Sequence, residues 1–300
     1  MLLINFITSN LFNYYRNKIV FLILASFKNK FIMKKNNFLL LFALLFTLVS
    51  CSSDDAGSGN SVPFSTPLSI GSYWTYDIED QSGINRDSLF VDSETTINNN
   101  TYKVFKAKND AATGFYSNSL KNNNVRENNG KLLLTGDLAL TAGQNLPFTI
   151  DLSLNDFIIF DKNASNNQTL NSSPKTGVIN ETVNGFPLTI SYSLQSYGGE
   201  TLSTFTSPNG MVYSNVKSTK IKLNLTITTI ITVLGSPQTF TALAPQDVLV
   251  STQYLSDGIG VVYTNTVTSY TVSNFVANEL QIPESDTQTQ EEFLDNYIIN

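Results

Sequence analysis

Apolar and polar residues alternate along most of the chain after residue 62. Apolar side chains occupy every second position from Leu146 to Leu154, from Phe186 to Leu194 and from Ile221 to Ile227. A period of two turns one face of an extended segment toward a core and the other toward water, as in antiparallel sheets. Threonine, valine, isoleucine and tyrosine fill these runs, in keeping with strand preferences. The pattern therefore predicts an all-β fold.

Turn signals and strand lengths predict the kind of sheet. Asn184-Gly185 favours a two-residue hairpin turn that joins a strand near Thr176–Val183 to a strand over Phe186–Gln195. The run from Val216 to Leu234 would extend about 60 Å as one strand. Such a strand must bend, cross a large coiled sheet or contain a bulge near Thr228-Thr229. We therefore expect a large, curved, half-barrel-like antiparallel sheet.

The domain organisation follows from the distribution of linker-like residues. No Pro/Ser/Gly-rich linker divides residues 63–283, so we expect a single all-β domain there. The polar stretch 162–175 predicts an exposed loop, and it would be the boundary if there were two domains. Residues 284–300 are predicted to be an acidic C-terminal tail. Within this tail, Glu291 to Ile298 has a helical spacing and predicts a short helix.

A different pattern precedes the strands and ends at Cys51, the only cysteine of the 300 residues. Two lysines follow Met33, an apolar run extends from Phe38 to Val49, and the small residue Ser50 precedes Cys51. This is the order of regions in a secretory signal peptide. The ending Leu-Val-Ser-Cys resembles the lipobox of bacterial lipoproteins. In that family the cysteine sulfur receives a diacylglycerol, the peptide is cut before the cysteine, and the new amino group is acylated, for example with palmitate.

Two simpler interpretations of Cys51 fit less well. The apolar run is far shorter than the roughly 20 residues that cross a bilayer, which argues against a transmembrane anchor. The Ser/Asp/Gly-rich stretch 52–60 predicts a flexible linker and offers no core for a buried thiol. We therefore predict a signal peptide over 33–50 and a lipidated tether over 51–62. Residues 1–32 are predicted to be an extended N-terminus or a misassigned start, because a signal peptide works from the chain start.

The acidic residues that follow Cys51 bear on location. The segment Cys-Ser-Ser-Asp-Asp resembles the export signal that sends Bacteroidota lipoproteins to the outer face of the outer membrane. A solvated acidic linker explains Asp54-Asp55 equally well. We therefore predict lipid anchoring to the outer membrane and leave open whether the protein faces the periplasm or the cell surface.

Composition excludes several classes of function. Residues 51–300 hold 12 basic and 24 acidic side chains, a net charge of −12, which disfavours nucleic acid as a partner. The chain contains no histidine, and Cys51 is committed to lipid. Ser-His-Asp and Cys-His catalysis are therefore excluded, as are zinc sites built from cysteine and histidine. We predict no catalytic, cofactor-binding or metal-binding residues, and no cofactor.

Three short motifs carry a family resemblance. Residues 67–76 (PLSIGSYWTY) resemble the P-L-x-x-G-x-x-W-x-Y opening of uncharacterised outer-membrane lipoproteins of Bacteroidota of flavobacterial type. Residues 92–102 resemble their x-T-x-I-N-G-x-x-Y hairpin, although Asn100 replaces a glycine, and residues 254–262 resemble their closing Y-x-x-G-x-G-x-V strand. The resemblance implies a strongly curved antiparallel sheet, similar to the half-barrel of periplasmic lipoprotein carriers, and no known activity.

Three aromatic residues, Trp74, Tyr254 and Tyr263, are candidates for a ligand-binding face. For Trp74 the alternative is a core anchor, which its place in an alternating strand favours. Gly258-Ile259-Gly260 lacks the strand–turn–helix setting of a phosphate-binding loop and predicts a turn or bulge. Two pairs of acids were considered for glycoside hydrolysis: Asp77 with Glu79, and Asp151 with Asp156. No spacing singles out either pair.

These observations favour a membrane-anchored lipoprotein that binds or scaffolds at the cell envelope without catalysis. Its ligand would be a lipid, a glycan or an envelope protein. One alternative is a surface glycan-binding lipoprotein of two immunoglobulin-like domains, which predicts displayed aromatic residues. A less favoured alternative is a carboxylate-dependent hydrolase, which predicts two acids about 5–10 Å apart in a cleft.

Overall fold

A computed structural model describes residues 64–140, 150–183, 185–233, 236–280 and 283–300. Residues 62–300 form one compact unit. The predictions made for residues 1–63, which include the signal peptide, Cys51 and the tether, lie outside the described residues, as does the part of the Leu146–Leu154 run that precedes Ile150.

Within the described residues, twelve strands form a single antiparallel sheet, and two short α-helices and one 3₁₀ turn join them. The strands are β1 (Tyr73–Asp80), β2 (Gly83–Ile97), β3 (Asn100–Ala107), β4 (Asn124–Asn128), β5 (Lys131–Leu140), β6 (Ile150–Asp161), β7 (Lys175–Val183), β8 (Phe186–Thr206), β9 (Val212–Val233), β10 (Ser236–Ser256), β11 (Gly260–Thr271) and β12 (Ser285–Ile298). The helices are η1 (Lys108–Asp110), α2 (Phe115–Leu120) and α3 (Asn274–Leu280). The predicted all-β, curved antiparallel sheet is confirmed.

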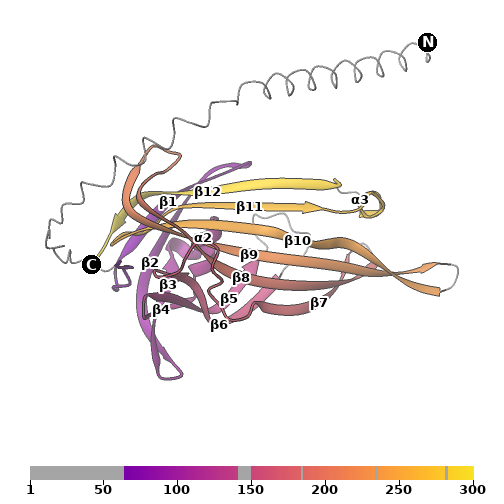
Figure 1. Cartoon of the computed structure of the whole chain (residues 1–300), viewed down its shortest axis with the longest axis horizontal. Coiled ribbons are helices and arrows are strands. Elements are labelled where there is room, and N and C mark those ends of the chain that lie inside the picture. The colour runs from indigo at the N-terminus through magenta and orange to yellow at the C-terminus, as the bar shows by residue number, and fades with distance from the viewer. Residues whose placement is uncertain (1–63, 141–149, 184, 234–235, 281–282) are drawn as a thin grey trace, which may run out of the picture. The chain divides into compact units, whose positions relative to one another are not determined.

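The sheet consists of two meandering arms that meet at β1 and β12. Its strand order is β6-β5-β4-β3-β2-β1-β12-β11-β10-β9-β8-β7, so neighbours in the sheet are neighbours in sequence except at the β1–β12 pair. That pair matches Tyr73 with Ile298 and Ile78 with Glu292. The arms curl toward one another (Figure 1), and β6 and β7 form the two edges. One continuous sheet leaves no place for two immunoglobulin-like domains.

The predicted C-terminal tail and its short helix are wrong. Residues 285–298 form β12, which pairs with β1 on one side and β11 on the other. Gln290, Glu292 and Leu294 are all buried, whereas most of the other residues of the strand are at least partly exposed. Because polar residues occupy two of these inward positions, the apolar alternation that marks a strand is missing from the sequence.

Side chains, and not a strand ladder, connect the β6 edge to the other arm of the sheet. The Asn171 amide accepts a hydrogen bond from the Ile158 N–H (2.9 Å) and donates to the Ile158 carbonyl (3.1 Å) and to Ser196 Oγ (2.8 Å). Thr219 Oγ1 donates to the Ile159 carbonyl at 2.9 Å. Main-chain groups at the β6 edge therefore find their partners in loop 162–174 and on β8 and β9.

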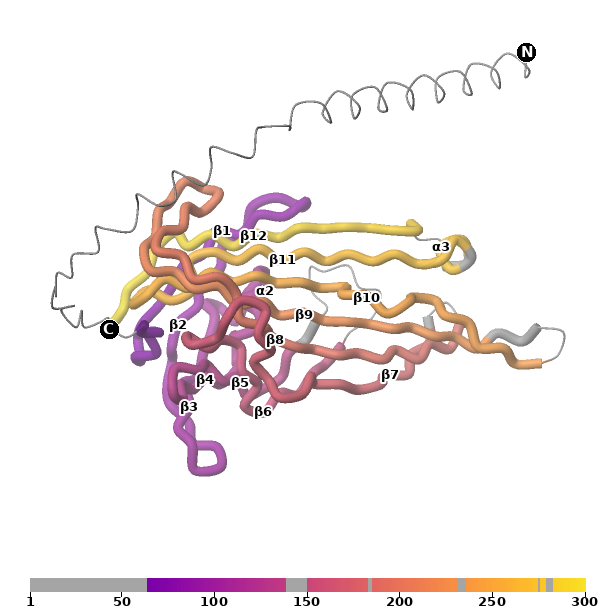
Figure 2. Tube along the Cα trace, in the orientation of Figure 1, coloured from indigo at the N-terminus to yellow at the C-terminus, as the bar shows by residue number. Residues whose placement is uncertain are grey.

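The predicted hairpin and the predicted long strand are both confirmed. Val183 pairs with Phe186, so β7 and β8 form the predicted antiparallel hairpin. Strand β9 is 22 residues long, and β8 and β10 each have 21. The register between β9 and β10 shifts near Leu243 and again near Asp247, so the bulges that break the ladder lie on β10, opposite the part of β9 where a bulge was expected. Figure 2 shows the β9–β10 hairpin extending well beyond its neighbours.

The core lies inside the curved sheet. Inward-facing residues of nearly every strand contribute to one apolar cluster, together with Phe115 and Leu120 of α2. Helix α2 lies between the two arms (Figure 1), where it fills part of the interior. Thus the concave face that a carrier would leave open is largely occupied by the protein itself.

Candidate functional site

The interior around α2 brings together the buried carboxylates of Asp87 and Glu292 and the buried amide of Gln290. Asp87 on β2 accepts hydrogen bonds from the N–H groups of Thr113 (2.9 and 3.0 Å to its two oxygens) and Gly114 (2.8 Å). Gln290 on β12 accepts one from the N–H of Phe115 at 2.7 Å. These bonds satisfy main-chain groups at the start of α2 that have no partner within the helix.

Glu292 completes the set of groups that hold the helix. Its carboxylate accepts hydrogen bonds from the Tyr116 N–H (2.6 Å), the Ser117 N–H (3.2 Å) and Ser117 Oγ (3.0 Å). Gly114 packs so closely on this carboxylate that a Cβ atom at that position would overlap with it. The helix is therefore held at its N-terminus by one carboxylate from β2 and an amide and a carboxylate from β12.

The same environment perturbs the ionisation of Glu292. Burial in the interior raises its pKa from 4.5 to about 7, and the nearby Asp87 charge acts in the same direction. The hydrogen bonds from Tyr116 and Ser117 favour the charged form and only partly offset the cost of burial. Glu292 therefore changes its charge near neutral pH while it is fully enclosed.

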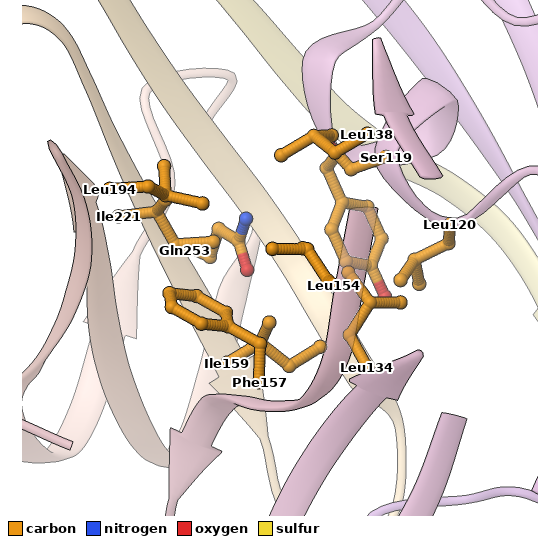
Figure 3. Close-up of a pocket in the computed structure, with 11 residues that line it drawn as sticks. Ser119, Leu120, Leu134, Leu138, Leu154, Phe157, Ile159, Leu194, Ile221 and Gln253 are labelled. Carbon is orange, nitrogen blue, oxygen red and sulfur yellow. The ribbon is translucent and has the colours of Figure 1, made fainter. Parts of the chain in front are cut away.

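Beside the helix, two small cavities share a wall. Tyr116, Leu120, Ile159 and Gln253 line both of them. One cavity continues among leucines of β5 and β6 toward Leu194 and Ile221, as Figure 3 shows. The other is bounded by Trp74 and by the segment Thr66–Leu68, which directly precedes β1.

Gln253 brings a side-chain amide to this largely apolar wall. It is 3% exposed, and its amide projects toward the space between Leu154 and Phe157 (Figure 3). Its side chain makes no hydrogen bond to the described residues. A buried amide without a partner costs roughly 1–3 kcal/mol, so it marks a position where a water molecule or a ligand group would be stabilised.

The size of the cavities decides what they hold in this conformation. Their volumes are about 10 and 30 Å³. A water molecule needs roughly 10–15 Å³ on this measure, whereas ligand pockets of ordinary size are about 300 Å³ or more. The closed interior therefore has room for water beside Gln253, and a larger ligand would enter only if the wall opened.

The structure places Trp74 in the core. It is 4% exposed, stacks on Phe105 with ring centroids 6.2 Å apart, and donates from Nε1 to the Ile259 carbonyl at 2.6 Å. Gly260, with a φ of +101°, lies directly against the indole. This placement favours the core-anchor interpretation. The Gly258-Ile259-Gly260 segment forms the turn between β10 and β11, as the sequence predicted.

Tyr254 and Tyr263 lie on the outer side of the sheet, opposite to Gln253. Their rings are 5.6 Å apart, and Phe205 from the β8–β9 hairpin stacks on Tyr254 at 4.3 Å. Tyr263 also stacks on Phe293 at 5.3 Å and donates its hydroxyl to Glu291. Burial and the adjacent carboxylate raise the pKa of Tyr263. Tyr263 is buried and Tyr254 half-buried, so the row secures the hairpin and is not a displayed platform.

In each acidic pair named above, one acid binds a basic side chain and the other is exposed. Asp77 pairs with Arg86 at 2.6 Å, while Glu79 is exposed near the end of β1. Asp156 binds Arg126 through both oxygens (2.8 and 2.7 Å) and accepts a bond from Tyr102, while Asp151 is exposed. Among the described residues, no group of three or more acidic, histidine or cysteine side chains is arranged to hold a metal ion.

The helices of the described residues are all too short or too polar to cross a membrane.

Comparison with known proteins adds little to this picture. No family model matches the chain, and no curated protein matches it. A crystal structure described as that of a candidate lipoprotein from Parabacteroides distasonis is similar, with 15% sequence identity and a TM-score of 0.38. The similarity covers 78% of this chain and 98% of that chain. A likeness at this level carries no functional argument.

Proposed function

We propose that this protein is a lipoprotein of the bacterial outer membrane, attached through acyl chains on Cys51, and that its β-domain binds or scaffolds without catalysis. The attachment is supported by the signal-like pattern that ends at Cys51. Two or more acyl chains also meet the requirement for stable anchoring.

The hydrogen bonds of the two buried carboxylates support the proposal that the domain is not a catalyst. Asp87 and Glu292 accept hydrogen bonds from main-chain N–H groups at the start of α2, and no open cleft separates them from the helix they hold. A glycosidase pair needs room for a sugar and a water molecule between its two acids. Here that space is filled by protein backbone, which supports a structural role for the pair.

Lipidation is tested by comparing the wild-type protein with Cys51→Ser in the native host. Wild type should incorporate radiolabelled palmitate, stay with membranes after a carbonate wash, and show a diacylglycerol-modified N-terminal cysteine by mass spectrometry. Cys51→Ser should lose all three properties. Incorporation of label by Cys51→Ser would contradict the assignment. Proteinase K treatment of intact cells then separates the surface face from the periplasmic face.

A second candidate function is binding of a single apolar chain in the interior. The observation that favours it is the unpaired amide of Gln253 between two apolar cavities, one of which is lined in part by Thr66–Leu68. Entry would require the cavity wall to open, because the cavities are smaller than a ligand. Native mass spectrometry of protein released gently from membranes provides the test. A bound lipid in wild type that is absent from Gln253→Leu would support it, whereas protein without ligand in both would refute it.

A further inference from the structure

Exposed apolar side chains gather at the end of the domain that follows the tether. Ile70, Tyr297 and Ile298 are between 41% and 49% exposed. Ile298 pairs with Tyr73 at the start of β1, and the side-chain amide of Asn300 donates to the Ile70 carbonyl at 3.3 Å. The three residues therefore lie at one end of the β1–β12 pair.

The turn between β8 and β9 carries two more exposed apolar residues at the same end of the sheet, because Val216 near the start of β9 pairs with Ser256 at the end of β10. Met211 and Val212 are 53% and 63% exposed. The hydroxyl of Tyr213, the next residue, lies 3.5 Å from the Leu294 carbonyl on β12. The same hairpin is held on the outer side of the sheet by the stack of Phe205 on Tyr254. We call Ile70, Met211, Val212, Tyr297 and Ile298 the tethered-end patch.

The position of the tether bears on what this patch contacts. The first described residues are secured to the β10–β11 turn, because the Ser65 N–H donates to Asp257 Oδ1 (2.7 Å) and the Gly258 N–H donates to the Ser65 carbonyl (2.9 Å). Ile70 follows only five residues later. The chain between Cys51 and Phe64 can reach at most about 45 Å even when fully extended. The acyl chains on Cys51 therefore keep this end of the domain close to the bilayer.

We propose that the tethered-end patch rests on the surface of the membrane that holds the Cys51 acyl chains. This inference depends on the proposed lipidation. Tethering over such a short span supplies an effective concentration of about 1 mM, so even a contact of millimolar intrinsic affinity is occupied about half of the time. Isoleucine, methionine and tyrosine suit the boundary between headgroups and acyl chains, where apolar bodies are buried and the tyrosine hydroxyl stays hydrated.

Charge favours an apolar contact over an electrostatic one. Residues 51–300 carry a net charge of −12, which repels an anionic surface. Contact through the patch should therefore persist in concentrated salt, where an electrostatic contact would be released. This property separates the proposal from adsorption through the basic side chains of the domain.

The chain offers a clean way to test the contact, because a lipidated Cys51 leaves no free thiol. Ile298→Cys, labelled with an environment-sensitive fluorophore, reports on the patch. Val178→Cys is the matched control, since Val178 is an aliphatic strand residue that is 61% exposed on β7, an edge strand that four strands separate from β12 in the sheet order. Both lipidated proteins are placed in phosphatidylethanolamine vesicles that carry a spin-labelled lipid as a quencher.

The expected result is a blue shift and at least about twofold stronger quenching at position 298 than at 178, unchanged in concentrated salt. If quenching is equally weak at both positions while the protein stays with the vesicles, membrane contact through the patch is refuted. Lipid attachment at Cys51 is not affected by that result. Protein released by a carbonate wash would overturn the anchor, and this proposal with it. Cross-linking between labelled sites of two molecules, without quenching, would overturn membrane contact in favour of a second copy.

Discussion

Glu292 provides the sharpest test of the interior, because it should make stability depend on pH in a range where ordinary carboxylates do not. Its pKa rises from 4.5 to about 7 on folding. The folded protein therefore binds more protons than the unfolded chain between these values, and stability falls as pH rises through this window. The contribution is fully present below about pH 4.5 and lost above about pH 7 to 8.

The magnitude follows directly from the shift. One pKa unit corresponds to about 1.4 kcal/mol, so wild type should lose about 3 kcal/mol of unfolding free energy between pH 5 and pH 8. Glu292→Gln keeps the shape and an acceptor oxygen for the helix but removes the titration, so its stability should be nearly flat over the same range. At 2–4 °C per kcal/mol for a domain of this size, the loss in wild type is about 6–12 °C in Tm.

The other groups whose pKa values are clearly perturbed titrate outside this window. Hydrogen bonds and ion pairs lower the pKa values of Asp92 and Asp156, so these groups titrate in acid, below the window. Burial raises the pKa of Tyr116 and Tyr263, so these groups titrate only in strong alkali. A slope between pH 5 and pH 8 would therefore arise chiefly from Glu292.

The assay is guanidinium unfolding of the unlipidated Cys51→Ser protein from pH 5 to pH 8. Trp74 is the only tryptophan, and its burial in the core makes its fluorescence a reporter of unfolding. Glu79→Gln makes the same chemical change at an exposed position on β1 and should keep the wild-type slope. A Glu292→Gln protein with the full wild-type slope, or a wild type with none, would refute the reasoning.

Three further substitutions test other parts of the fold. Asn171→Ala removes the three hydrogen bonds across the gap between β6 and β8 and should cost about 2–3 kcal/mol of unfolding free energy in denaturant melts, whereas the exposed Asn163→Ala should cost almost nothing. Gln253→Leu removes an unpaired buried amide and should raise the unfolding free energy by about 1 kcal/mol; a loss of similar size would show that the amide is paired in solution. Phe205→Ala should free the β8–β9 hairpin from Tyr254, with loss of amide-exchange protection confined to that hairpin; unchanged protection would show that the stack does not hold it.

Local pattern was enough to predict the strands whose inward residues are all apolar. In β9, Ile221, Leu223 and Leu225 are buried in strict alternation, and the Asn184-Gly185 turn marks the preceding hairpin. The signals for these elements come from residues close together in the sequence, so one sequence is enough to predict them. The curvature of the sheet was also foreseeable, because strands as long as β9 cannot stay flat and straight in a compact domain.

The polar interior was not predicted, although a signal for it exists. Ser251 and Gln253 occupy the same alternating positions as Leu249 and Leu255, and Asp87 occupies the same parity as Leu89. A polar residue at an inward position of an otherwise apolar run marks a buried polar group that needs a partner. The partner itself cannot be read from the sequence, because the strand register that brings it close depends on the whole sheet.

Helix α2 and strand β12 escaped prediction for one shared reason. The residue before α2 is Gly114, and no side chain near it in sequence caps the helix, so the usual sign of a helix start is missing. Strand β12 lacks the usual sign of a strand, because Gln290 and Glu292 stand where apolar residues are expected. The two absences are connected, because two of the three side chains that hold the start of α2, Gln290 and Glu292, are on β12, about 175 positions along the chain. Gln290 and Glu292 interrupt the apolar pattern of β12 because they supply hydrogen bonds to the start of α2. Neither element can therefore be predicted from its own residues alone, and both can be explained once their contact is known.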